Sequence, residues 1–122
     1  MSLLTYKVLH LLGLFLLFGS LGGVALVAVQ GGTKQSLQGR RLVYATHGIG
    51  LLLVLVSGFG MLARLGITSG LPGWVWAKLV IWLLVAASIT LPLRARATAV
   101  PAWFVLPLLG AVGGWLALNK PF

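Results

Sequence analysis

The chain has 122 residues, 60% of them hydrophobic, and it carries nine Lys and Arg but no Asp, Glu or Cys. It therefore has no side chains for carboxylate catalysis, a Ser-His-Asp arrangement, disulfides, thiolate zinc sites or iron–sulfur clusters. A mean hydropathy of +1.10 places it in the membrane class, and its length suits a single domain.

The hydropathy pattern divides the chain into four apolar stretches, each close to the roughly 20 residues with which a helix crosses a bilayer core. In chain order they cover residues 4–29, 42–63, 73–93 and 101–118. The first is too long and too continuous for the apolar part of a signal peptide, so we expect it to be retained. The connections are short, which favours antiparallel neighbours. The sequence therefore predicts an all-α fold, a single integral membrane four-helix bundle with up-down-up-down topology.

Glycine and proline mark the ends of these stretches. Gly31-Gly32 follows the first stretch, and Pro92 and Pro101 bracket the connection before the fourth. Pro107 lies inside the fourth stretch, where we expect it to kink a helix that a membrane bundle can accommodate.

Small residues indicate where helices approach one another closely. Gly19-x3-Gly23 forms a GxxxG pattern, and Gly50, Ser57 and Gly58 allow the second helix to approach a neighbour. We expect the GxxxG pattern to pack within the bundle rather than to mediate dimerisation.

The cations have no acidic side chains to pair with, so their counter-charges must come from outside the chain. Lipid phosphates, an acidic partner subunit or a ligand with carboxylates would supply them. Because the basic residues are scattered between apolar runs, we expect no nucleic-acid partner. In the predicted topology Lys7, Arg64, Lys78 and Lys120 lie towards one membrane face, and the other five cations lie in the two connections at the opposite face.

Three ionisable residues, His10, His47 and Lys78, lie within the predicted helices, and such residues at membrane depth are functional hypotheses by default. His10 and Lys78 lie towards the same face, because the first and third helices run parallel, and Arg64 lies there too. A histidine among cations would attract a flat, apolar dianion, such as a porphyrin with two propionates. His10 would then be an axial haem ligand. The alternative is a histidine hydrogen-bonded between helices or facing the headgroups.

The other candidates also have structural alternatives. Lys78 could instead anchor its helix by reaching to the interface. Trp74, Lys78 and Trp82 share a face at four-residue spacing, which suits stacking on a macrocycle or a cation–π contact. His47 lies towards the opposite face, where it either binds a second cofactor or packs among small neighbours. Met61 is either a second axial ligand or a filler of the core.

Four short motifs occur along the chain: Tyr6-Lys7-x-x-His10, Arg40-Arg41-Leu42, Trp76-Ala77-Lys78-Leu79 and Lys120-Pro121-Phe122. Their ordered combination resembles the small four-helix bacterial protoporphyrinogen IX oxidases of the HemJ type. The resemblance implies a b-type haem, with His10 and Lys78 as the functional pair. It also implies oxidation of protoporphyrinogen, electron transfer to quinone or the respiratory chain, and a place in the bacterial cytoplasmic (inner) membrane.

Two functional hypotheses follow. The first is a haem- or porphyrin-binding oxidoreductase, with His10 and Lys78 catalytic, His10 the metal ligand, and Arg64, Trp82 and His47 as further cofactor-binding residues. A relative that binds the porphyrin without oxidising it is a variant of this hypothesis. The second is a non-catalytic accessory subunit that docks by its apolar faces and cationic rim to an acidic membrane complex, or forms a homo-oligomer.

Overall fold

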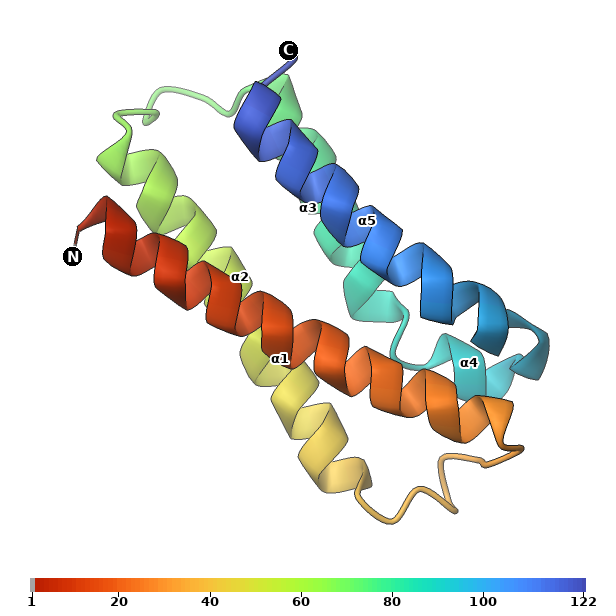
Figure 1. Ribbon diagram of the computed structural model, residues 1–122. Coiled ribbons are helices and arrows are strands. Elements are labelled where there is room, and N and C mark those ends of the chain that lie inside the picture. Colours follow the sequence, from red (N-terminus) through yellow and green to blue (C-terminus); the bar gives the residue numbers. More distant parts are fainter. Residues whose placement is uncertain (1) are drawn as a thin grey trace.

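The computed structural model describes residues 2–122, and in this range the chain is helical with no strand. The elements are α1 (Leu3–Val29), α2 (Arg40–Arg64), α3 (Gly73–Ala87), a short α4 (Leu91–Arg94), a 3-10 turn η1 (Arg96–Thr98) and α5 (Ala99–Asn119) (Figure 1). The first, second and fourth predicted stretches are confirmed within two residues at each end.

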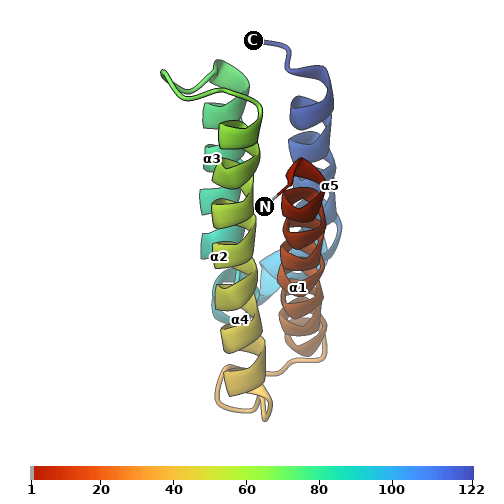
Figure 2. The ribbon, with the colours of Figure 1, turned by 90° about the vertical axis from the view of Figure 1, so that its left-hand side faces the viewer.

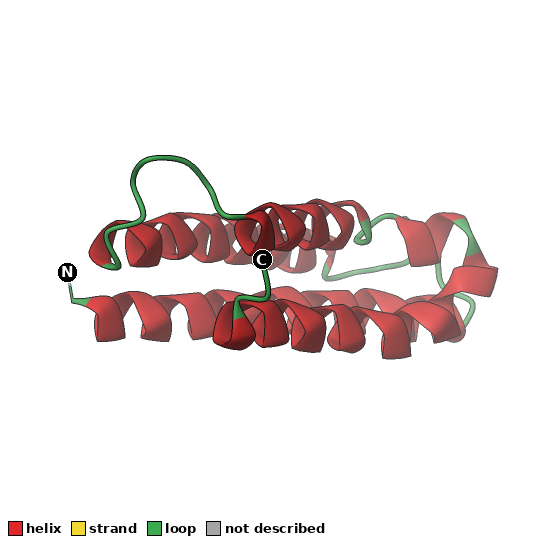
Figure 3. Ribbon diagram, turned by 90° about the horizontal axis from the view of Figure 1, so that it is seen from above, coloured by secondary structure: helices red, strands yellow, loops and turns green. Residues whose placement is uncertain are grey.

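The long helices form two layers (Figure 3). Figure 2 shows α2 and α3 on one side and α1 with α5 on the other. Helices α1 and α2 run antiparallel and make the most extensive contact in the molecule, while α5 packs on both α1 and α3 (Figure 1). The α2/α3 contact is sparse.

Three segments are long and apolar enough to cross a membrane: α1, α2 and the continuous run Arg96–Asn119. The all-helical prediction and the membrane-length helices are therefore confirmed. Helix α3, with 15 residues, is shorter than the others.

The third helix is shorter than the predicted 73–93 because it ends at Ala87. Pro92 is the cause, since its ring has no N–H for the carbonyl of Ser88 and would clash with that carbonyl in a continuous helix. The hydroxyls of Ser88 and Thr90 turn back and donate to carbonyls of the last turn of α3. The chain then restarts as α4, with Pro92 in its first turn, where a missing N–H costs nothing. Apolar composition alone did not reveal this break.

The opposite end of α3 is covered by the segment that follows α5. The backbone N–H of Trp74 donates to the carbonyl oxygen of Phe122 at 3.2 Å. This bond satisfies one of the free N–H groups of the first turn, for which Pro72 supplies no side-chain cap. Lys120 adopts a left-handed conformation that ends α5, and its ammonium lies 5.8 Å from the centre of the Trp74 ring. The segment thus ties the end of α5 to the start of α3.

Two apolar clusters make up the core. The larger is formed by buried side chains from α1, α3 and α5 with neighbours in the first connection and after α3: Leu17, Leu21, Val24, Leu37, Val85, Ile89 and Leu106. The smaller joins the end of α2, the start of α3 and the end of α5: Leu62, Trp74, Val75 and Leu116.

Helices α1 and α2 cross with their backbones in close approach at two glycines. A Cβ atom at Gly50 would lie 2.9 Å from the carbonyl oxygen of Gly13 and 3.0 Å from the backbone nitrogen of Leu17. By contrast, a Cβ at Gly19 or Gly23 would meet nothing within 4 Å. The expectation that the GxxxG pattern packs within the bundle is therefore wrong, and the close approach lies one to two turns earlier on α1.

We expect Gly50→Ala to destabilise the protein by about 1–3 kcal/mol, because the added methyl group meets backbone atoms that cannot rotate away. Thermal unfolding in detergent, followed by circular dichroism, measures this change. Gly48→Ala is the matched control, since a Cβ there would meet nothing within 4 Å. The control should leave stability unchanged or raise it by up to about 1 kcal/mol through helix propensity. Equal effects of the two substitutions would contradict the close crossing.

Candidate functional site

His10 lies on α1 and is held by a hydrogen bond across the α1/α2 interface. Its Nδ1 is 3.0 Å from the Oγ of Ser57, which is buried in α2. The Ser57 hydroxyl has one hydrogen, and it donates this hydrogen to the carbonyl of Leu53. Ser57 Oγ is therefore the acceptor and His10 Nδ1 carries the proton. This network assigns the neutral tautomer in which Nε2 has a free lone pair.

The glycine crossing explains why His10 and Ser57 meet. The two helices run antiparallel, so a step towards the start of α1 matches a step towards the end of α2. Gly13 lies against Leu53 and Val54 of α2, so His10, one turn before Gly13, lies opposite Ser57, one turn after Leu53. The His10 ring also lies beside Gly58, where a Cβ would be in ordinary contact at 3.7 Å from Cε1.

Lys78 of α3 lies at the same end of the molecule as His10, since α1 and α3 both begin there. The Lys78 side chain is half-buried, and no hydrogen bond or cation–π contact within residues 2–122 involves its Nζ. The structure therefore places the two residues that the sequence singled out at the same end of the molecule. One offers a lone pair and the other an unshared positive charge.

Other cations lie at the same end of the molecule, where α2 and α5 end and α1 and α3 begin (Figure 1). Arg64 is exposed in the last turn of α2, and Lys7 is exposed one turn before His10. Lys120 is also exposed, and its ammonium lies over the ring of Trp74. This end is thus strongly cationic, with His10 and Lys78 its partly buried members.

Trp82 joins α3 to α2. Its indole Nε1–H donates to the carbonyl of Leu51 at 3.1 Å. The predicted stripe of Trp74, Lys78 and Trp82 is thus divided among different contacts, because Trp74 is buried under Lys120 and Trp82 is bonded to α2. The cofactor-binding role of Trp82 stays a prediction, and the structure shows a helix-to-helix anchor.

His47 is 4% exposed and bonds the end of α3. Its Nε2 lies 3.2 Å from the carbonyl of Ala86, one of the last carbonyls of α3, which have no partner within the helix. Nε2–H therefore donates, and Nδ1 is left buried with no partner among the described residues. His47 acts as a cap supplied by a neighbouring helix. A second cofactor at His47 stays a prediction.

Sequence analysis missed the role of Ser57, which it treated only as a small packing residue. Identifying the serine as the partner of His10 requires the register of α1 against α2, and that register depends on which glycines form the crossing.

Within residues 2–122 no three His, Cys, Asp or Glu side chains gather into a metal-binding group. A metal bound at this site would therefore take His10 as a ligand, together with a methionine sulfur or a group from another molecule.

Comparisons with protein-family models, with curated proteins and with solved structures find no match for this chain. The resemblance to the HemJ-type oxidases therefore rests on the ordered motifs, two of which contain His10 and Lys78.

We expect His47→Leu to destabilise the protein by about 1–3 kcal/mol, because the Ala86 carbonyl then stays buried without a donor. His47→Gln keeps an N–H donor and should recover part of this loss. Thermal unfolding of both variants in detergent is the measurement. If both variants lose the same stability, packing volume rather than the hydrogen bond explains the burial of His47.

Proposed function

We propose that this chain is a haem- or porphyrin-binding integral membrane protein that acts as a protoporphyrinogen IX oxidase-like oxidoreductase. The observation that carries the proposal is the pairing of a histidine with a free Nε2 lone pair and a lysine with an unshared charge. His10 would ligate the iron of the haem, and Lys78 would bind a propionate of the porphyrin substrate. The acid-free chain offers no internal competitor for that ammonium.

The donor set at this end fits a haem. Neutral imidazole is a common axial ligand, and such ligands usually donate their other ring N–H to a fixed acceptor. Ser57 is that acceptor here, and its own hydrogen bond to Leu53 fixes its orientation. Met61 lies one turn beyond Ser57 on α2 and would be a candidate for a further ligand from this chain. A bound haem would supply one-electron transfer.

The chain's residues would position and receive the substrate. Lys78 and the nearby Arg64 would hold the carboxylates of protoporphyrinogen, and the lipid-facing apolar side chains would accept its macrocycle. On oxidation the porphyrinogen loses hydrogens as protons and electrons, and a membrane quinone takes up the electrons. The resemblance to the HemJ-type oxidases supports this direction of electron flow.

The membrane topology is part of the proposal. Helices α1, α2 and α5 each have the length to cross, whereas the 15 residues of α3 span only about 22 Å of a bilayer core about 30 Å thick. The segment from Ser88 through α4 would extend α3 across the rest of the bilayer core. With α1, α2 and α5 this makes four crossings and an up-down-up-down bundle. By the same resemblance, the membrane is the bacterial cytoplasmic (inner) membrane.

The test is the absorption spectrum of the protein purified in detergent and reconstituted with haem. We expect a Soret band that is lost in His10→Ala and retained in His47→Gln, which keeps a donor to α3. Ser57→Ala should weaken haem binding about 10–100-fold by removing the acceptor that orients His10, and Ser57→Thr should restore it.

Loss of the band in His47→Gln with retention in His10→Ala would move the site to the other histidine. A colourless protein that co-purifies with a large complex would support the accessory-subunit hypothesis instead. Protoporphyrinogen oxidation by the haem-loaded protein, with a quinone as acceptor, then tests the enzymatic part separately from binding.

We expect Lys78→Met to weaken porphyrin binding about 10–100-fold, because a charge-assisted bond to a carboxylate contributes about 1.5–3 kcal/mol. Lys78→Arg should retain most of the affinity. Titration of tryptophan fluorescence with protoporphyrin IX measures binding, and its dimethyl ester is the control ligand because it has no carboxylates. If Lys78→Met lowers the affinity for the ester as much as it lowers the affinity for the free acid, Lys78 does not bind a propionate. Lys7→Met, an exposed neutralisation at the same end, is the matched variant and should change little.

A further inference from the structure

A second candidate site lies at the opposite end of the molecule, between the last turns of α1 and the first turns of α5. An open apolar groove of about 200 Å³ is lined there by Leu26, Val29, Val100 and Trp103. Neither His10 nor Lys78 contributes to it, so it is separate from the candidate haem site. The lining has no charged side chain.

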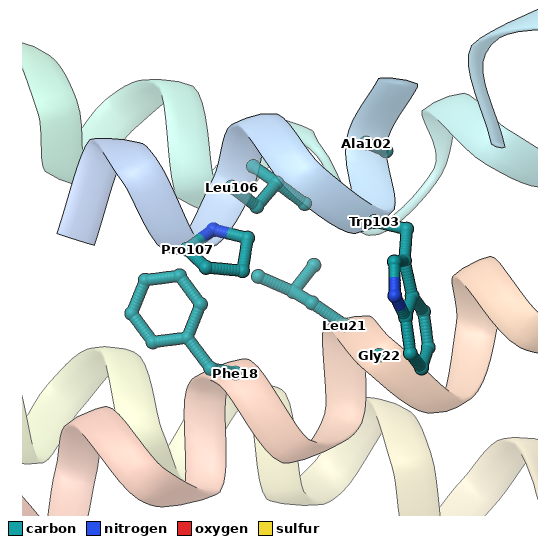
Figure 4. A pocket seen from close by; sticks show the side chains of 7 residues that line it. All are labelled: Phe18, Leu21, Gly22, Ala102, Trp103, Leu106 and Pro107. Atoms are coloured by element: carbon teal, nitrogen blue, oxygen red, sulfur yellow. The ribbon is translucent and has the colours of Figure 1, made fainter. Parts of the chain in front are cut away.

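A second, smaller pocket lies along the α1/α5 interface and shares only Trp103 with the groove. Figure 4 shows the Trp103 side chain reaching from α5 to α1 beside Gly22, with a smaller pocket on its other side. Phe18 and Pro107 bound that pocket, so both hollows along the α1/α5 interface are lined by apolar side chains. Gly22 lies beside the indole ring, and a Cβ there would make an ordinary contact with it at 3.9 Å.

A cation lies near the mouth of the groove. The guanidinium of Arg96 lies against Gly31, where a Cβ would be 3.3 Å from its Nη2. Gly31 has a φ of +83°, which suits glycine and turns the chain directly after α1. Along the chain, the lining residue Val29 comes two residues before Gly31, and Val100 comes four residues after Arg96. The Arg96 guanidinium is exposed and makes no hydrogen bond within residues 2–122.

We propose that this groove binds an anionic phospholipid, with an acyl chain along the apolar lining and the phosphate on Arg96. An apolar slot with a guanidinium at its mouth matches the two parts of such a lipid, and guanidinium forms paired hydrogen bonds with phosphate. Charge argues against a helix from a second copy as the occupant. A copy of this chain carries no Asp or Glu and adds only further cations.

The test uses nanodiscs of phosphatidylcholine that contain a minor fraction of phosphatidylglycerol with brominated acyl chains. Bromine quenches nearby tryptophans, and the difference between wild type and Trp103→Phe isolates the signal of Trp103. We expect Trp103 to be quenched more strongly by brominated phosphatidylglycerol than by the same fraction of brominated phosphatidylcholine. Arg96→Gln should reduce this preference about tenfold, as expected for one charge-assisted contact.

Arg41→Gln is the matched control, since it removes one exposed cation at the same end and should change the preference less than about twofold. Equal losses in Arg96→Gln and Arg41→Gln would overturn the proposal in favour of diffuse attraction to the membrane surface. Quenching of Trp103 that is the same for both lipids would also overturn it. A dimer detected by mass measurement, with Trp103 protected from both lipids, would show that a second copy fills the groove. None of these outcomes depends on haem binding.

Discussion

The close approach of α1 and α2 at Gly13 and Gly50 is the constraint on which the rest of the structure depends. Without side chains at these points, backbone atoms of the two helices come within van der Waals contact. The crossing sets the register of the largest helix interface, and that register places the imidazole of His10 against Ser57. The orientation of the free Nε2 lone pair is thus a consequence of two missing Cβ atoms one and two turns away.

Hydrogen bonds connect α2 and α3, which pack less closely than α1 and α2 do. Helix α3 contacts α2 sparsely, yet Trp82 and His47 each donate a hydrogen bond across that gap to a backbone carbonyl. One bond is to the interior of α2 and the other is to the end of α3. In a low-dielectric environment an unmatched carbonyl is costly, so such bonds specify position strongly. The short α3 is therefore located by its polar groups as much as by apolar packing.

The sequence predicted the long helices well because apolar length is a direct record of membrane span, and it found His10 and Lys78 because ionisable residues stand out in apolar helices. It overextended the third helix, since the effect of Pro92 on the Ser88 carbonyl is geometric and leaves hydropathy unchanged. It identified Gly50 of α2 as a close-approach residue, but on α1 it chose Gly19 and Gly23 instead of Gly13. GxxxG spacing marks a smooth helix face but not which neighbour, if any, covers it. The roles of Ser57 and His47 depend on contacts between helices, which no local pattern records.

The bond between Trp74 and Phe122 has a mechanical consequence. It fastens the end of α5 to the start of α3, so the first turn of α3 depends on a residue that lies almost fifty positions later in the chain. Helix α5 also packs on α1, and the larger apolar cluster joins all three helices. His10 on α1 and Lys78 on α3 are therefore placed relative to one another mainly through α5. A change at Phe122 would alter the start of α3 while the α1/α2 crossing stays intact.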